Sequence, residues 1–258
     1  MSTLQAELER LYIPRDAVHQ KQDLAESCLI TPDGTVRAMV LELARPADWT
    51  VLTALWQGVQ ADLGLPAPAI AVSGIDGFQL WFSLAEPVSV AQACAFLESL
   101  RLRYLSQVTT DRISMRPFID RSMPQKAVHA ALVPRQREET GRWSAFVASD
   151  LAAIFADEPW LDLPPSPEAQ ANVLARLECI KLADFQEVLE RLKPVDLRRG
   201  AHAQSDANKL IQDDAETINS PSQGKGMDPK GFLLGVMNNP AVELHLRIEA
   251  AKALLPYF

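Results

Sequence analysis

The chain has 258 residues, of which 48% are apolar and 22% charged, and its formal net charge is −8. This composition excludes a collagen, a coiled coil and a wholly disordered protein. No apolar run reaches the roughly 20 residues of a membrane span, and the first residues lack a signal-peptide pattern. Because the three cysteines, Cys28, Cys94 and Cys179, are far apart in the sequence, we expect a cytoplasmic protein with no disulfide framework, no cysteine zinc site and no membrane partner.

The negative charge is unevenly distributed along the chain. Residues 1–100 carry 5 basic and 12 acidic side chains and residues 143–258 carry 11 and 17, but residues 101–142 carry 9 basic and 4 acidic ones. Such a local basic excess can attract phosphates on an acidic protein, because salt screens repulsion beyond about 10 Å. The alternative is a solvated face with a few ion pairs.

Hydrophobic periodicity predicts alternating helices and strands in the first 150 residues. In chain order they are a helix over about the first 25 residues, a strand at 36–43, a helix capped by Asp48, a hairpin of strands at 69–73 and 77–84, a helix from Ser89 to Tyr104, and a second hairpin of strands near 126–133 and 142–148. We expect Pro87 to end the second strand of the first hairpin. This order predicts an α+β domain over residues 1–150, with a mainly antiparallel sheet covered by helices.

The pattern changes beyond residue 150. Residues 151–195 are predicted to form a helical extension, residues 196–226 a polar flexible linker, and residues 227–258 a helical hairpin with two apolar stripes. A hairpin of this size is too small to be stable alone, so we expect it to dock on the main domain, on a second copy or on a protein partner. It resembles short helical segments of phage proteins, including small terminase subunits.

Several common catalytic motifs are missing from the sequence. There is no Gly-x-Ser-x-Gly, no P-loop, no Gly-x-Gly-x-x-Gly and no His-Glu-x-x-His. The four histidines are scattered, and His129 falls in a predicted strand, where we expect an ordinary structural role rather than a ligand. A serine-hydrolase triad, a dinucleotide fold and a helical zinc site are therefore not supported.

One set of residues does form a recognisable pattern. A strand ending in Leu41-Glu42-Leu43-Ala44 is followed by the turn Ser73-Gly74-Ile75-Asp76-Gly77 and a strand containing Gln79, and then by Asp111-Arg112-Ile113-Ser114-Met115-Arg116-Pro117. With these motifs, residues 35–120 resemble the catalytic module of the archaeo-eukaryotic primase superfamily. This superfamily includes the polymerase domains of bacterial ligase fusions and the primase-polymerases of plasmids and phages.

The resemblance implies a metal-dependent nucleotide site. Glu42 and Asp111 would be the catalytic and metal-binding acids, holding Mg²⁺ or Mn²⁺, and no other cofactor is implied. Glycines let backbone N–H groups approach a phosphate. The residues implied in phosphate binding are Ser73, Gly74, Gly77, Gln79, Arg112, Arg116 and Arg121.

Two departures from the family pattern concern catalysis. Ala44 stands where the first motif has its second acid, and Gln79 stands where the second motif has histidine. Two-metal catalysis needs several carboxylates around cations about 3.5–4 Å apart, so one Glu and Asp111 are a poor set. We therefore expect a catalytically degenerate protein of phage or mobile-element type that binds nucleotide, or DNA or RNA as a single strand or primer–template.

Three other interpretations remain open at this stage. The chain is a protein–protein adaptor with no nucleic-acid role, acting through residues 227–258. It is an active primase or DNA polymerase, and so a metal-dependent nucleotidyltransferase. In the simplest interpretation, residues 73–77 are a plain hairpin turn, Glu42 is a strand-end carboxylate and Arg116 lies in a loop.

Overall fold

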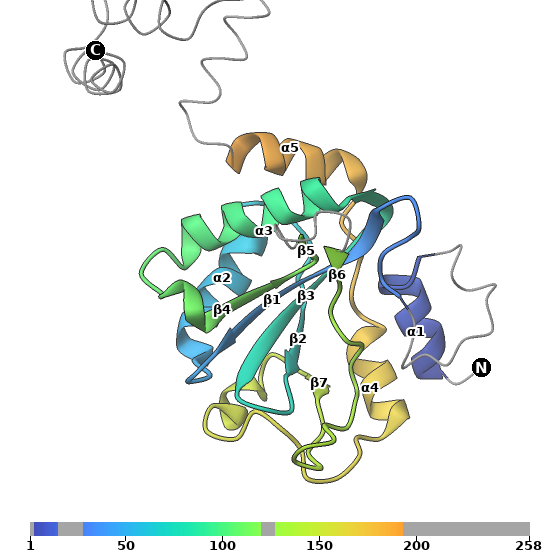
Figure 1. Ribbon diagram of the computed structural model, residues 1–258, viewed down its shortest axis with the longest axis vertical. Coiled ribbons are helices and arrows are strands. Elements are labelled where there is room, and N and C mark those ends of the chain that lie inside the picture. Colours follow the sequence, from blue (N-terminus) through green and yellow to red (C-terminus); the bar gives the residue numbers. More distant parts are fainter. Residues whose placement is uncertain (1–2, 15–27, 120–126, 193–258) are drawn as a thin grey trace, which may run out of the picture. The chain divides into compact units, whose positions relative to one another are not determined.

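The computed structural model describes residues 3–14, 28–119 and 127–192, which belong to one compact unit spanning Met1–Gly200 (Figure 1). The predicted linker at 196–226, the predicted hairpin at 227–258 and Arg121 lie outside the described residues. Within the described ranges, no helix is both long and apolar enough to cross a membrane.

A five-stranded antiparallel sheet forms the centre of the unit, with the strand order β4–β1–β3–β2–β7 (Figure 1). Two further short strands, β5 and β6, pair separately as an antiparallel ribbon. The strands are β1 (Thr35–Ala44), β2 (Ala69–Val72), β3 (Gly77–Ser89), β4 (Ile113–Arg116), β5 (Phe118–Ile119), β6 (Ala127–Val128) and β7 (Ala145–Val147). The mixed helix and strand content and the mainly antiparallel sheet confirm the predicted α+β class.

Helices cover both faces of this sheet. Alternate residues of a strand point to opposite faces, and the strands carry apolar side chains on both faces, which the helices bury. On β1, Met39, Leu41 and Leu43 join a core that includes residues of α2, α3 and α5, whereas Ala38 and Val40 join a second core with residues of α1 and α4. The helices are α1 (Thr3–Leu11), α2 (Trp49–Ala61), α3 (Val90–Tyr104), α4 (Pro167–Leu174) and α5 (Leu182–Leu192), with short 3-10 helices η2 (Thr110–Arg112) and η3 (Ala152–Phe155). The first helix thus ends earlier than predicted, since residues 12–14 are not helical, and residues 15–27 lie outside the described residues.

The predicted helix starts are confirmed at two caps. The carboxylate of Asp48 accepts a hydrogen bond from the N–H of Val51 at the start of α2. Ser89 and Gln92 form a reciprocal capping box at the start of α3. These caps satisfy N–H groups that a helix cannot bond internally, which is why they mark helix starts in a sequence.

Two predicted features of the strands are wrong. The strand β3 does not end at Pro87 but runs on to Ser89. Its pairing with β1 is interrupted between Ser83 and Val88, and Pro87 lies in that irregular stretch. Proline is tolerated there because no backbone N–H is needed for a hydrogen bond to β1. The strands near 126–133 and 142–148 do not pair with each other. Instead β6 pairs with β5 and β7 with β2, although residues 135–144 between them still turn back through backbone hydrogen bonds.

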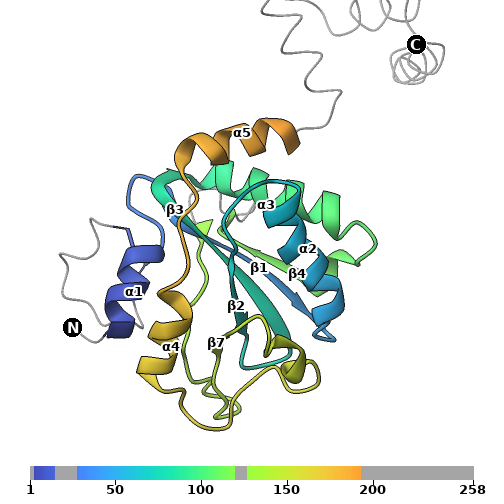
Figure 2. The same cartoon turned by 180° about the vertical axis from the view of Figure 1, so that it is seen from behind.

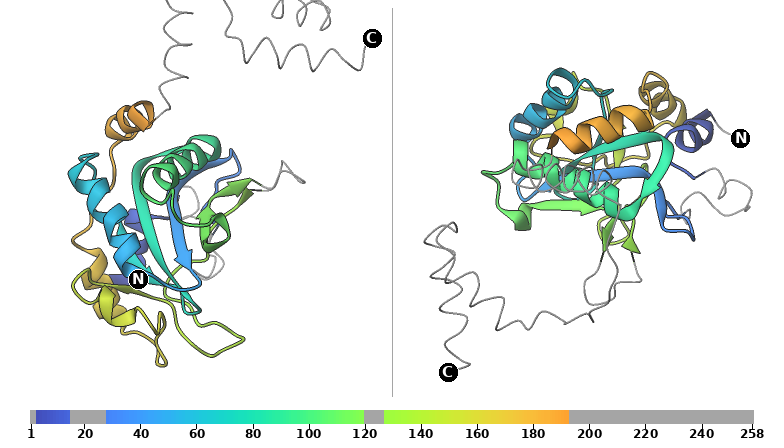
Figure 3. Two further views of the ribbon diagram at one scale, coloured as in Figure 1. Left: turned by 90° about the vertical axis from the view of Figure 1, so that its left-hand side faces the viewer. Right: turned by 90° about the horizontal axis from the view of Figure 1, so that it is seen from above.

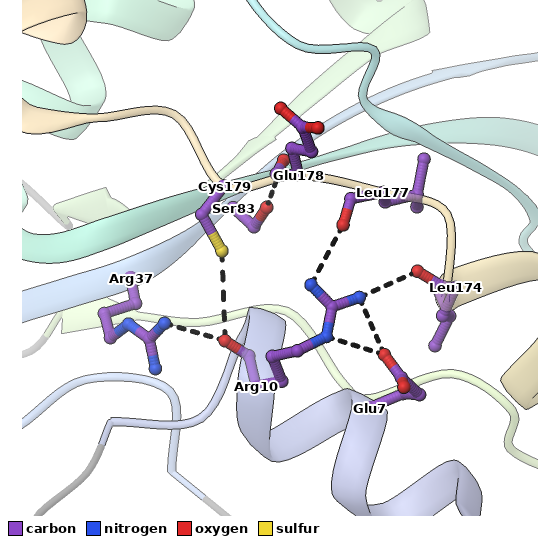
Figure 4. Close-up of polar contacts among 8 residues, drawn as sticks. All are labelled: Glu7, Arg10, Arg37, Ser83, Leu174, Leu177, Glu178 and Cys179. Atoms are coloured by element: carbon purple, nitrogen blue, oxygen red, sulfur yellow. Dashed lines mark hydrogen bonds and ion pairs between the residues drawn. The ribbon is translucent and has the colours of Figure 1, made fainter.

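The described part of the predicted extension, residues 151–192, packs on the sheet through α4 and α5. The helix α5 lies along α3 (Figures 2 and 3), and Ile180 bridges to Leu84 of β3. The helix α4 lies against α1, where the guanidinium of Arg10 donates to the carbonyls of Leu174 and Leu177 (Figure 4). The N-terminal helix is thus held by a segment more than 150 residues further along the chain.

Candidate nucleotide-binding site

Part of the predicted site converges on one pocket of about 180 Å³. We call it the Glu42 pocket, and it is lined by Val40, Glu42, Gln79, Ser114, Arg116, His129, Ala130, Ala131 and Arg137. Three residues singled out from the sequence are therefore brought together: Glu42, Gln79 and Arg116. The other predicted site residues within the described ranges are not among its lining residues.

The sheet register explains how these side chains come to share a face. Glu42 on β1 lies directly opposite Gln79 on β3 and Ser114 on β4, and Val40 lies opposite Arg116. Directly paired residues of antiparallel strands project to the same side of a sheet. The strand next to Glu42 therefore presents a hydroxyl at this position, where a second carboxylate would be needed to share a metal ion.

A chain of hydrogen bonds orients the amide of Gln79. Its Nε2 donates to Oε2 of Glu42 at 2.8 Å, and its Oε1 accepts from the indole Nε1 of the buried Trp81 at 2.9 Å. Because Trp81 is only a donor, it holds the amide oxygen on its own side and turns the NH₂ group toward Glu42. The amide of Gln79 thus presents donors rather than its acceptor to the carboxylate.

The charges in the pocket favour an anionic ligand. Burial raises the pKa of Glu42, while the hydrogen bond from Gln79 and the charges of Arg137 and Arg116 act to lower it. Two guanidinium groups and His129 thus surround one carboxylate. Arginine is well suited to phosphate because its planar fork of donors matches the phosphate oxygens.

Arg137 is held in place by the predicted Ser-Gly turn. Its Nε and Nη2 both donate to the carbonyl oxygen of Ser73, at 3.0 and 2.7 Å, although the two residues are 64 positions apart. This anchor brings the loop between β6 and β7 to the sheet. A residue from outside the motif region thereby contributes a cation to the Glu42 pocket.

The N–H groups of the Ser-Gly turn are engaged within the protein. The hydroxyl of Ser73 accepts from the N–H groups of Ile75, Asp76 and Gly77, and the N–H of Gly74 donates to the carbonyl of Pro159. None of the turn residues lines the Glu42 pocket. In this structure the turn therefore holds the hairpin together, and its backbone donors do not face the pocket.

The two glycines of this turn are needed for packing. Gly74 has a φ of +79°, which side chains rarely tolerate, and an added Cβ would lie 2.8 Å from the N of Ser144. A Cβ at Gly77 would lie 2.8 Å from the carbonyl oxygen of Leu43 on β1. The close approach of neighbouring backbones thus accounts for glycine at both positions.

Asp111 and Arg112 lie in η2, away from the lining of the Glu42 pocket. The carboxyl of Asp111 is exposed, and a side-chain hydrogen bond from Thr109 lowers its pKa. Arg112 donates to the carbonyls of Ala44 and Pro46, at 3.3 and 2.9 Å, just beyond the end of β1. In this arrangement Arg112 supports the backbone near the β1 terminus.

The donor set of the pocket does not fit a pair of divalent metal ions. Glu42 is its one carboxylate, whereas Mg²⁺ and Mn²⁺ are held by several oxygen ligands, chiefly carboxylates. Across the described residues, no group of three or more His, Cys, Asp and Glu side chains is placed to hold a metal ion.

Three lining residues were not identified as site residues from the sequence: Ser114, His129 and Arg137. Ser114 lies within the pattern Asp111-Arg112-Ile113-Ser114-Met115-Arg116-Pro117, and the sequence predicts only a structural role for His129. Arg137 belongs to the basic stretch of residues 101–142. The excess of positive charge in residues 101–142 was the one available signal for Arg137. Charge alone does not say which arginine faces which carboxylate.

A larger pocket, of about 350 Å³, involves α2, β2 and α4. Most of its lining is apolar, including Trp56, Pro68, Ile70 and Val173. It contains none of the site residues predicted from the sequence. Its polar lining residues are Ser149, Asp150, Asn172 and Arg176, so it has one arginine where the Glu42 pocket has two.

The comparisons with known proteins gave matches to solved structures. No family model and no curated protein matches the chain. The chain is similar to the polymerase domain of Mycobacterium tuberculosis ligase D in complex with DNA, with 21% identity and a TM-score of 0.33 over 58% of this chain and 57% of that one. It is also similar to the AEP domain of the cyanophage S-2L primase-polymerase, with 19% identity and a TM-score of 0.27 over 59% and 64%. It spans less than two thirds of either neighbour's length.

Proposed function

We propose that this chain is a nucleic-acid-associated protein whose primase-polymerase-like core binds phosphate in the Glu42 pocket without polymerising nucleotides. The ligand is a nucleotide or a nucleic acid, as a single strand or a primer–template. The observation that carries the proposal is the meeting of Arg116 and Arg137 around a single carboxylate, with Gln79 and Ser114 beside it.

The chemistry of these groups supports phosphate as the bound group. Arg116 and Arg137 supply positive charge and fixed donors, and Gln79 is held with its NH₂ group on the pocket side of the sheet. Arg137 is already positioned by Ser73, so little side-chain freedom is lost when it binds a ligand. Such preorganised cations bind phosphate more tightly than mobile surface lysines do.

The same groups argue against nucleotidyl transfer. Transfer by this type of site requires two divalent cations bridging the nucleotide phosphates, and the pocket offers only Glu42 to hold them. Ser114 is a neutral neighbour, and Asp111 does not line the pocket. We therefore assign the pocket to binding and positioning rather than to bond formation.

Filter binding or fluorescence anisotropy at low and at moderate salt tests the binding. We expect the wild type to bind a labelled oligothymidylate and the double variant Arg116→Ala/Arg137→Ala to lose about tenfold or more in affinity, because each guanidinium lost removes a phosphate contact. Arg103→Ala is the matched control, since Arg103 is a half-exposed arginine of α3 that pairs with Asp62 outside the pocket. Negligible retention of wild type and double variant alike would contradict the proposal.

Primer extension with nucleoside triphosphates and Mn²⁺ or Mg²⁺ tests the absence of catalysis. We expect no extended product from the wild type. A product that disappears in Glu42→Ala would instead show that the chain is an active polymerase, and would place the metal ions at this pocket.

A further inference from the structure

The ribbon of β5 and β6 carries two exposed apolar side chains beside the Glu42 pocket. Phe118 and Val128 lie directly opposite each other in the ribbon, and they are 49% and 40% exposed. The guanidinium carbon of Arg116 lies 5.9 Å from the ring centroid of Phe118, and His129 directly follows Val128. Both Arg116 and His129 line the pocket. The apolar pair therefore borders the cationic side of the pocket.

The ribbon is anchored in a way that presents this pair outward. Ile119 and Ala127, which also lie opposite each other, pack against the main core. Because alternate residues of a strand point to opposite faces, this anchoring leaves Phe118 and Val128 on the other face. Neither is part of the two cores of the unit. Phe118 is thus exposed because of how the ribbon is oriented, and its ring does not pack in either core.

We propose that Phe118, supported by Val128, is a stacking platform for an unpaired base of a strand whose phosphate lies in the Glu42 pocket. This inference rests on the proposed function and narrows its ligand to single-stranded nucleic acid. Proteins bind single strands by combining cationic contacts to the backbone with aromatic side chains on which bases stack. Here the two components lie side by side, with Arg116 contributing to both.

The charge beside the platform favours a nucleic-acid strand over an apolar protein surface. The guanidinium of Arg116 lies over the ring of Phe118, and His129 and Arg137 line the same pocket as Arg116. A phosphate adds charged acceptors for these groups, whereas an apolar protein surface would remove water from them and offer no acceptor. Along a duplex the base faces are covered by their neighbours, so stacking on Phe118 favours an unpaired base.

The experiment compares two oligomers of equal length and charge, an oligothymidylate and an abasic backbone, at one salt concentration. We expect the wild type to bind the oligothymidylate more tightly. Phe118→Ala should lose about tenfold for the oligothymidylate and be unchanged for the abasic oligomer. Leu102→Ala is the control, because Leu102 is 51% exposed on α3 and lies outside the ribbon. Phe118→Trp should keep the affinity, and its added indole fluorescence should be quenched when a base stacks on it.

Three outcomes would overturn the platform. The first is equal binding of both oligomers by the wild type, which leaves the phosphate pocket intact but removes the base contact. The second is a Phe118→Ala variant that loses both oligomers equally, or neither. The third is a Phe118→Trp variant that binds without quenching. If the wild type binds neither oligomer, the proposed function fails together with the platform, and this result differs from all three.

Discussion

The amide of Gln79 and the carboxylate of Glu42 join two neighbouring strands at the centre of the candidate site. Their nitrogen and oxygen lie 2.8 Å apart, and the two residues face each other in the register of β1 and β3. The donor side of Gln79 is set by the buried indole of Trp81. The hydrogen bond thus connects the pocket to the core of the sheet. The protonation state of Glu42 is therefore expected to affect both the free energy of unfolding and the affinity for a ligand in the pocket.

The pH dependence of stability is expected to follow the raised pKa of Glu42. Burial raises this pKa, so the folded state binds its proton more readily than the unfolded state, and wild-type stability falls as the pH rises through the two values. Glu42→Gln removes this loss while keeping an acceptor for Gln79. We expect the variant to gain stability relative to wild type at neutral pH, and the gain to shrink at lower pH, as measured by urea unfolding across pH. A gain independent of pH would contradict the role of the proton.

The affinity for phosphate is expected to depend on the same proton. An ionised Glu42 repels a bound phosphate, so Glu42→Gln should bind an oligothymidylate more tightly than wild type at neutral pH. The difference in affinity between the two should therefore narrow at acidic pH, as read by anisotropy. A constant ratio would show that Glu42 does not face the phosphate.

The indole of Trp81 is expected to be energetically coupled to the amide of Gln79, which it contacts at 2.9 Å. Trp81→Phe leaves the buried amide oxygen without its donor, and the loss should be about 1–3 kcal/mol of unfolding free energy. Gln79→Leu removes that amide. In a double-mutant cycle, Trp81→Phe should reduce the free energy of unfolding by about 0.5–3 kcal/mol less in the Gln79→Leu variant than in the wild type. Strict additivity in denaturant unfolding would show that the indole does not position Gln79.

Ser73 is expected to act through the fold rather than through ligand contact. Ser73→Ala removes the acceptor shared by three backbone N–H groups of the turn, so we expect a loss of about 1–3 kcal/mol in unfolding free energy. The affinity of the folded variant for an oligothymidylate should stay within about twofold of wild type. Ser144→Ala, which removes another buried hydroxyl bonded to backbone at Arg135, is the matched control. A selective loss of binding in Ser73→Ala would restore a phosphate role for the turn.

Arg37 is expected to be the strongest single polar contribution to the docking of α1. It is buried on β1, and its guanidinium donates to the carbonyls of Ile13, Arg10 and Leu84 (Figure 4 shows the contact with Arg10). Arg37→Ala leaves these carbonyls without a charged donor, so unfolding free energy should fall by roughly 3 kcal/mol. The exposed Arg103 is the comparison, since Arg103→Ala should change stability by about 1 kcal/mol or less. Equal effects in thermal unfolding would contradict this assignment.

The regular elements were largely predictable because their signals are local. The continuous apolar run along β1, the cap at Asp48 and the capping box at Ser89 depend on residues only a few positions apart. Pro87 was misjudged because a proline normally ends a strand, and only the interrupted pairing with β1 shows that its missing N–H is not needed. The pairing of β6 and β7 was misjudged because two adjacent strands joined by a turn usually form a hairpin.

The motif analysis found Glu42, Gln79 and Arg116 but neither Ser114, His129 nor Arg137 as site residues. The first three lie in short patterns that can be compared with a known family. The others contribute through long-range packing, as with the anchor of Arg137 on Ser73 across 64 positions.

The sequence by itself determined the α+β class, most of the helices and strands and the local basic excess on an acidic chain. It did so because propensity, periodicity and composition are properties of neighbouring residues or of the whole chain. The tertiary structure alone decided that Ser114 lies beside Glu42, that Arg116 and Arg137 line one pocket, and that the Ser-Gly turn bonds to itself. These outcomes depend on strand register and loop packing. Both bring together residues that are far apart in the sequence, so their contact cannot be inferred from it.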